Sequence, residues 1–190
     1  MDFGWDNPGN DPQSHYMRWH TQGALEIIVQ MLDYYDNTQD VDYLREKIMP
    51  FAEAILTYYN EHWKRGADGK ILFSPHQSIE MYQEGVVNPT PDIAGLHAIT
   101  VRMLSLPADI VSVKTRELLN TLHDDLPAIP LGNTQNGKIP LNGKGDASGL
   151  PVILPAQEYG KAANAENPEL YAVFPYRNYG LGKPDIELAR

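Results

Sequence analysis

Apolar side chains recur at the spacing of an α-helix in two stretches of the first third of the chain. They are Ala24, Ile27, Ile28, Met31, Leu32 and Tyr35 in the first stretch, and Leu44, Ile48, Phe51, Ile55 and either Tyr58 or Tyr59 in the second, where His62 continues the spacing. Residues at i, i+3, i+4 and i+7 share one face of a helix, so both stretches predict amphipathic helices. Pro50 lies inside the second stretch and predicts a kink or a break there. We therefore expect a first helical pair over about 11–65.

A second helical pair is indicated over about 91–124. Thr90, Pro91 and Asp92 supply a capping side chain, a proline for the first turn and an acidic residue near the helix N-terminus. The first helix of this pair should end near residue 105, before Pro107, and the second should cover about 110–124.

Residues 127–180 are expected to be loop-rich, because prolines, glycines and asparagines cluster there. They leave room for short strands at 138–141 and 152–154, in addition to one at 70–74. A connection of this length in a compact chain is usually functional or disordered. The sequence therefore predicts an all-α fold with minor β-structure, in which helical pairs form part of a ring around a central cleft.

Charge and composition restrict the partners. A formal charge of −10 over 190 residues argues against nucleic acid and anionic membrane surfaces, whereas neutral glycans stay compatible. The length suits one domain, the absence of cysteine excludes disulfides and thiol catalysis, and no stretch reaches transmembrane length.

No motif for a cofactor or a metal is present. The chain has no phosphate-binding glycine loop, no dinucleotide fingerprint and no esterase elbow. Its six histidines form no H-E-x-x-H motif, and His15 and His20 are five residues apart rather than the four that zinc favours on a helix. The sequence therefore predicts neither a cofactor nor a metal site.

Glu80 is the candidate catalytic residue. It lies in a turn-prone stretch beside Ile79, Met81 and Tyr82. A carboxyl held among apolar and aromatic side chains is disfavoured in its charged form and can deliver a proton near neutral pH, as a general acid does. The alternative interpretation is a solvated loop glutamate.

Aromatic side chains near the first helix have two interpretations. Trp5, Tyr16, Trp19 and His20 form either part of the core or a platform on which a sugar ring stacks. Of these, Trp5, Trp19 and His20 are taken as candidate substrate contacts, together with Tyr82.

Two carboxylates and one arginine complete the candidate binding residues. Asp92 is interpreted as a charge at a helix N-terminus. Glu166 and its neighbour Glu169 flank an Asn-Pro pair and either contact substrate or form a solvated turn. Arg177 ends an aromatic and polar segment that begins at Asn167.

Four segments carry a resemblance to a known family. They are Trp19–Glu26, Gly69–Glu80, Asn88–Leu96 and Asn167–Arg177. The first two resemble the catalytic domain of glycoside hydrolase family 95, which contains α-L-fucosidases and related α-glycosidases. The last two resemble segments of bacterial family-95-like proteins from polysaccharide-degrading systems. The likeness covers nearly the whole chain but only part of the family's domain.

The resemblance implies a six-hairpin (α/α)6 toroid with a glutamate as general acid. The family's pattern around that glutamate is similar to S-P-x-x-S-P-E, and Ser74–Glu80 matches it except that Ile79 replaces the second proline. The aspartate that follows in the family corresponds to Asp92. The family's N-x-N segment and its later aspartate have no counterpart here, and its H-R-H-x-S-H-L segment is replaced by Asn167–Arg177.

We therefore expect residues 1–190 to be a fragment, truncated at both ends, of a bacterial glycosidase that hydrolyses an α-linked oligosaccharide or polysaccharide with inversion, Glu80 being the acid. One alternative is a non-catalytic toroid that binds glycans or acts as a scaffold. Another is a polysaccharide lyase in which Tyr176 and Arg177 serve as base and neutralising cation. The resemblance implies a periplasmic or secreted location.

An open ring would expose the apolar flanks of its end helices, and large apolar patches favour aggregation. On that ground we expect residues 1–190 expressed alone to be inactive and to aggregate. A monomeric fragment with a sharp thermal transition and measurable glycosidase turnover would contradict this expectation.

Overall fold

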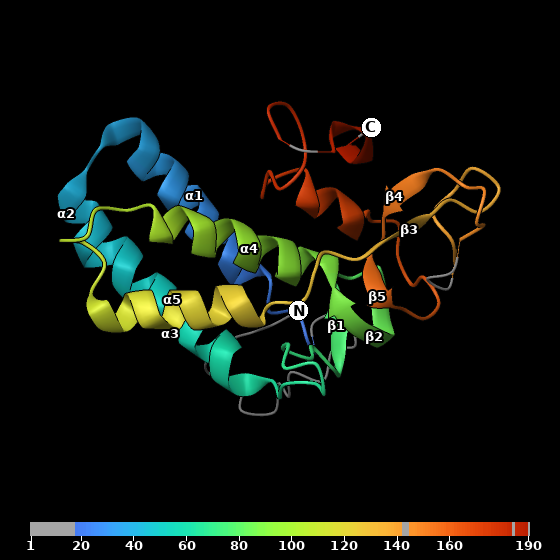
Figure 1. The fold of residues 1–190 in the computed structure, drawn as a ribbon, viewed down its shortest axis with the longest axis horizontal. Helices are drawn as coiled ribbons and strands as arrows, with labels where there is room; N and C mark the ends of the chain where they lie inside the picture. Colours follow the sequence, from blue (N-terminus) through green and yellow to red (C-terminus); the bar gives the residue numbers. More distant parts are fainter. Residues whose placement is uncertain (1–17, 142–144, 184, 190) are drawn as a thin grey trace, which may run out of the picture.

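The computed structural model describes residues 18–141, 145–183 and 185–189. Figure 1 shows the long helices stacked together on one side of the molecule and the short strands gathered on the other. The C-terminal segment after residue 160 returns from the strands to lie against the helices. None of the helices described is long and apolar enough to cross a membrane.

The first helical pair consists of α1 (Gly23–Thr38) and a longer, irregular second helix. That second helix runs through α2 (Val41–Tyr43), the π-helical η1 (Leu44–Ile48) and α3 (Met49–His62) without a break. The N–H of Met49 donates to the carbonyl of Leu44, five residues back, which is the π pattern. The predicted irregularity at Pro50 therefore takes the form of a π turn directly before a residue that lacks its own N–H.

The second helical pair is α4 (Thr90–Leu104) and α5 (Val113–Asp125). The side chain of Ser112 caps α5 by accepting a hydrogen bond from the Thr115 N–H at 3.1 Å. Helix α4 contacts α1, α5 and the 3-10 helix η2 (Pro168–Ala172), while α3 contacts α1 and α5. A second 3-10 helix, η3, covers Ile186–Ala189.

Two small antiparallel sheets lie beside the helices. The first has the strand order β1 (His76–Ser78), β2 (Tyr82–Pro89) and β5 (Ala156–Glu158). The second pairs β3 (Leu131–Asn133) with β4 (Pro151–Ile153). Val87 is paired with Glu158, so two strands about seventy positions apart in the sequence meet at the end of β2, just before the chain enters α4.

The expectation of an all-α (α/α)6 toroid is wrong. Of the described residues, 45% are helical and 14% are in strands or bridges, and the fold is mixed α and β with four helices longer than one turn. In the loop-rich region 127–180, the short strand predicted at 152–154 corresponds to β4, whereas β3 and β5 were missed and the strand predicted at 138–141 is reduced to a bridge between Lys138 and Gln135. The predicted strand over 70–74 is reduced to a single bridge between Ile71 and Arg65. Because the fold is not a toroid, the expectation that residues 1–190 aggregate through the exposed ends of an open ring has no basis in this structure.

Strand pairing was missed because it depends on partners that are distant in sequence. Hydrophobic alternation marks a strand only when one face is buried along its length. Strand β2 is buried at both ends and exposed in the middle, at Glu84 and Gly85, so it has no clean alternation. Strand β5 is three residues long and offers no periodicity at all.

One large core joins the helices to the C-terminal segment. Its fully buried members from the helices include Leu25, Ile28, Leu44, Leu56, Ile93, Leu96 and Leu119. Ala172 of η2 and Tyr176 belong to the same core, so the C-terminal segment is anchored on the helices at these two residues. A smaller cluster under the sheets contains Tyr82, Val86, Leu154, Ala156 and Tyr159.

Gly95 allows the C-terminal segment to approach α4. A Cβ atom placed on Gly95 would lie 2.8 Å from the ring carbon Cζ of Tyr176 and 3.0 Å from Cδ1 of Leu25. Both distances are below ordinary van der Waals contact, so α4 and Tyr176 can pack this closely only because residue 95 has no side chain.

We predict that Gly95→Ala destabilises the protein by about 1–3 kcal/mol, because a methyl group would overpack the interface between α4 and Tyr176. Gly23→Ala is the matched control, since a Cβ there meets nothing within 4 Å and the site is the first residue of α1. Denaturant titration of both variants gives the free energies of unfolding. Equal stabilities for the two variants would contradict the prediction.

Candidate functional site

The turn between β1 and β2 presents Glu80. Ile79, just before it, has a φ of 44°, in the left-handed region that a β-branched residue rarely adopts. Its side chain is only 4% exposed, so burial holds this costly conformation in place. Such backbone strain is often found at functional sites. A proline, whose φ is held near about −65°, could not occupy position 79 in this turn, so the S-P-x-x-S-P-E pattern does not extend to it.

The buried side chain of Gln77 fixes the turn from behind. Its Oε1 accepts a hydrogen bond from the Trp19 N–H at 2.7 Å, and its Nε2 donates to the carbonyl of Ile79 at 2.9 Å. The Ser78 hydroxyl donates to the carbonyl of Pro155 at 2.7 Å. The turn that carries Glu80 is thus tied both to the segment before α1 and to the segment before β5.

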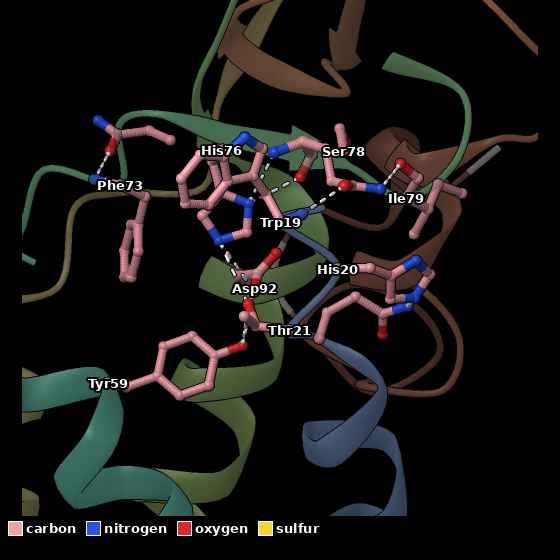
Figure 2. Close-up of polar contacts among 12 residues, drawn as sticks. Trp19, His20, Thr21, Tyr59, Phe73, His76, Ser78, Ile79 and Asp92 are labelled. Atoms are coloured by element: carbon pink, nitrogen blue, oxygen red, sulfur yellow. Dashed lines mark hydrogen bonds and ion pairs between the residues drawn. The ribbon is translucent and has the colours of Figure 1, made fainter. Parts of the chain in front are cut away.

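Below the turn lies a buried cluster of polar side chains around Asp92, drawn in Figure 2. Oδ1 of Asp92 accepts hydrogen bonds from the Tyr59 hydroxyl at 2.6 Å and from the Thr21 hydroxyl at 2.9 Å. Nε2 of His76 lies 3.5 Å from the same oxygen. The four residues come from α4, α3, the segment before α1 and β1, and Figure 2 shows their side chains converging.

Burial and the Asp92 charge act together on the tyrosines of this cluster. Desolvation, followed by the nearby Asp92 carboxylate, raises the pKa of Tyr59 well above its usual value, so its hydroxyl is a hydrogen-bond donor at all physiological pH values. Desolvation and Asp92 also raise the pKa of Tyr176. Within the described chain, Oδ2 of Asp92 and the hydroxyl of Tyr176 are buried without a hydrogen-bond partner.

Glu80 itself lies beside a second carboxyl residue, Glu166. The Glu80 N–H donates to Oε2 of Glu166 at 2.9 Å, although the two residues are 86 positions apart. Oε2 of Glu80 accepts a hydrogen bond from the exposed Asn164 amide at 3.1 Å. The N–H of Ala163 donates to the carbonyl of Met81 at 2.8 Å, which holds the 163–166 segment against the turn.

Glu80 is half-buried, and its carboxylate accepts a hydrogen bond from the side-chain amide of Asn164. The sequence had led us to expect apolar surroundings for this carboxylate, and the structure shows a polar contact instead. Glu169, on η2, has a more apolar position. Desolvation raises the pKa of its carboxyl above the usual value. It also lies near Tyr82, whose pKa is raised by burial and then by the Glu169 charge.

A cavity of about 540 Å³ adjoins the Glu80 turn, and we call it the Glu166 cavity. Ile79, Glu166 and Asn167 are among the residues that line it, and most of the residues that α1 contributes are polar or acidic. The remaining lining residues are Glu26, Val29, Gln30, Asp33, Leu170, Tyr171, Phe174, Pro175 and Arg177. The volume and the mixture of apolar and polar groups are those of a small-molecule site.

A second cavity, of about 450 Å³, is lined by Trp19 and by residues of β1 and β2; we call it the Trp19 cavity. Arg18, Pro75, Glu84 and Glu158 also contribute to it. Trp19 is half-buried there, so it matches neither a fully buried core residue nor a fully exposed surface on which a sugar ring could stack.

The structure brings together only part of the predicted set. Glu80, Glu166 and Arg177 lie at or beside the Glu166 cavity, while Trp19 lines the other one. Asp92 is in the first turn of α4, as predicted, but is fully buried and lines neither cavity. Trp5 lies outside the described residues.

His20 and Tyr82 also lie away from the Glu166 cavity. His20 is half-buried, with Nε2 3.0 Å from the side-chain nitrogen of Gln22. Tyr82 is 6% exposed and packs on Tyr159 at a ring distance of 4.9 Å, in the core under the sheets. The structure therefore gives Tyr82 a packing role.

Several residues of the site were missed from the sequence. Thr21, Tyr59 and Gln77 carry no motif, since their hydrogen bonds join segments 38 to 71 positions apart. Phe174 was one of several aromatics in the 167–177 segment, and no local pattern shows that its ring is exposed. His76 could have been singled out by its place two residues after Ser74 in the Ser74–Glu80 motif.

No group of three or more metal-ligating side chains is found in the described part of the chain. Comparison with protein-family models, with curated proteins and with solved structures gives no match.

We predict that Tyr59→Phe lowers the free energy of unfolding by about 1–3 kcal/mol, because buried Asp92 loses its shortest hydrogen bond. Tyr58→Phe is the control. The Tyr58 side chain is 40% exposed, and the change should stay within about 0.5 kcal/mol. Urea titrations of the two variants, made at neighbouring positions of α3, measure the difference. Equal losses would show that the Asp92 bond contributes nothing specific.

Proposed function

We propose that this protein is a glycoside hydrolase acting on an α-linked glycan, with Glu80 as its proton donor and Glu166 as the second carboxylate. The observation that carries the proposal is the hydrogen bond from the Glu80 N–H to Glu166, which puts Glu80 next to a carboxylate that lines one cavity. Paired carboxyl groups on either side of the scissile bond are the usual machinery of glycosidases. The resemblance to family 95 adds support at Ser74–Glu80, and the resemblance to bacterial family-95-like proteins adds support at Asn167–Arg177.

The separation of the two carboxyls is compatible with this role. A glutamate carboxyl carbon lies at most about 5 Å from its own backbone nitrogen, given standard bond lengths. Since Oε2 of Glu166 is 2.9 Å from the Glu80 nitrogen, the two carboxyls are within about 8 Å of each other. That limit includes the lower part of the range of about 6.5–9.5 Å in inverting enzymes, and also the distances of about 5–5.5 Å in retaining ones.

In the proposed reaction, the protonated Glu80 carboxyl donates its proton to the glycosidic oxygen as the bond from that oxygen to the anomeric carbon breaks. Glu166 takes a proton from a water molecule, whose oxygen bonds to the anomeric carbon from the opposite face. One water is consumed, and the anomeric configuration is inverted. Proton transfer from Glu166 back to Glu80, by way of solvent, restores both groups.

A second candidate, glycan binding without catalysis, is favoured by one observation. The Glu80 carboxylate bonds to the exposed Asn164 amide and is only half-buried, which suits a residue that accepts sugar hydroxyls. The Glu166 cavity would serve a binding protein equally well. Hydrolysis by the wild-type protein distinguishes the two candidates.

The lyase alternative has less support. A catalytic base of this kind needs a lowered pKa, and burial raises that of Tyr176. The Arg177 guanidinium donates to both carboxylate oxygens of Asp33, at 3.0 and 2.8 Å, so its charge is already compensated.

We predict that Glu80→Gln in the native protein lowers kcat/KM on α-linked oligosaccharides by about 100-fold or more, the range of general acid catalysis. Glu84→Gln is the control, because Glu84 follows Glu80 by four residues, is exposed on β2 and lines the Trp19 cavity. Activity of Glu80→Gln within about threefold of wild type, less than one kcal/mol of barrier, would remove Glu80 from the mechanism.

Glu169→Gln, measured in the same series, tests the other carboxyl near the turn. A large loss confined to Glu169→Gln would transfer the acid role to that residue. The anomer formed first, followed by NMR, reports inversion directly, and a product of retained configuration would contradict the water-activating role of Glu166.

A further inference from the structure

Phe174 is the most unusual side chain of the Glu166 cavity. It lines the cavity, yet 72% of it is exposed, and its neighbour Leu170 is 54% exposed. Its N–H donates to the Leu170 carbonyl at 2.8 Å, so the backbone beneath it is ordered. A large aromatic ring held at the rim of a cavity by a packed segment is a typical binding contact.

The charges in the cavity are unbalanced. Arg177 is its only cationic lining residue in the described chain, and Asp33 neutralises it through two hydrogen bonds. Asp33 is also paired with Arg102 at 2.9 Å, and Arg102 with Asp36 at 2.7 Å, so this surface network is electrically neutral as a set.

Glu26 and Glu166 have no such cationic partner among the described residues. Glu166 accepts the Glu80 N–H, and Glu26 lies beside the Tyr171 hydroxyl. Burial, followed by the Glu26 charge, raises the pKa of Tyr171 to about 12, so this hydroxyl remains a neutral donor. The lining of the cavity therefore carries two carboxylates, Glu26 and Glu166, that no cation of the described chain compensates.

We propose that the Glu166 cavity holds one ring of an uncharged sugar, which stacks on Phe174 and donates its hydroxyls to Glu26 and Glu166, and that it rejects acidic sugars. This inference rests on the proposed function, because it names the class of glycan for the same site. Phe174 is then a specificity-determining residue. The carboxylates of Glu26 and Glu166 attract the hydroxyl groups of a neutral sugar and repel the negative charge of an acidic one.

The physical basis is the two-sided character of a sugar ring. One face presents C–H groups, which suit an apolar aromatic plane, while the edge carries hydroxyl donors that match carboxylate and amide acceptors such as Gln30 and Asn167. A uronate or sulfate group would meet Glu26 and Glu166 without a free cation to offset the repulsion. Specificity through such a repulsive contact is common in binding sites.

Binding is measured on the Glu80→Gln protein, so that no substrate is consumed. A glycan array carrying neutral α-linked oligosaccharides and uronate- or sulfate-bearing ones identifies the class, and calorimetry gives Kd for the best neutral glycan and for its uronate counterpart. We expect the neutral glycan to bind at least about tenfold more tightly, a difference of about 1.4 kcal/mol.

Phe174→Ala should weaken binding of the neutral glycan about five- to tenfold, and Phe174→Trp should restore it. Leu150→Ala is the matched control, because Leu150 is 73% exposed and lines neither cavity, and it should leave Kd unchanged. Glu26→Gln should reduce the difference in Kd between the neutral glycan and its uronate counterpart.

Three outcomes would overturn the inference: no neutral glycan on the array binds, acidic glycans bind as tightly as neutral ones, or Phe174→Ala binds like wild type. Failure of the proposed hydrolysis has a different signature. There, Phe174-dependent binding of a neutral glycan would persist while the wild-type protein released no product, as expected for a binding protein.

Discussion

The buried carboxylate of Asp92 is the interaction on which the rest of the structure depends. A charge removed from water is costly unless it is paired or hydrogen-bonded. Asp92, which is fully buried, meets this requirement at Oδ1, which contacts the hydroxyls of Tyr59 and Thr21 and has His76 nearby, while Oδ2 has no partner in the described chain. Because these partners come from α3, from the segment before α1 and from β1, one side chain fixes both helical pairs relative to the hairpin (Figure 2).

The position of the hairpin decides where the candidate chemistry lies. With β1 fixed at His76, the side chain of Gln77 reaches from Trp19 to the carbonyl of Ile79 and sets the shape of the turn. Ile79, whose backbone is left-handed, lines the Glu166 cavity, and the N–H of Glu80, the next residue, donates to Glu166. The strained residue and the two carboxyl residues thus form one unit.

The cavity beside that unit is formed by segments that only the fold brings together. Helix α1 supplies Glu26 and Asp33, and the segment after η2 supplies Phe174 and Arg177. The close approach of that segment to the helices depends on Gly95, over which the ring of Tyr176 lies. Packing in the core and recognition at the surface are therefore coupled through neighbouring residues, since Phe174 and Tyr176 are two positions apart.

The sequence by itself determined the helices, because their apolar spacing and the first-turn residues Pro91 and Asp92 are local signals, and it singled out Glu80, Glu166 and Arg177 as candidates. It did not determine the sheets, whose strands are short and pair across about seventy positions, and so the all-α prediction was wrong. Nor could it separate Asp92, Tyr82 and Trp19 from the residues of the Glu166 cavity, since burial depends on what packs above a side chain. Only the tertiary structure placed Glu80 against Glu166 and left the ring of Phe174 exposed, because contacts between distant segments have no trace in local spacing.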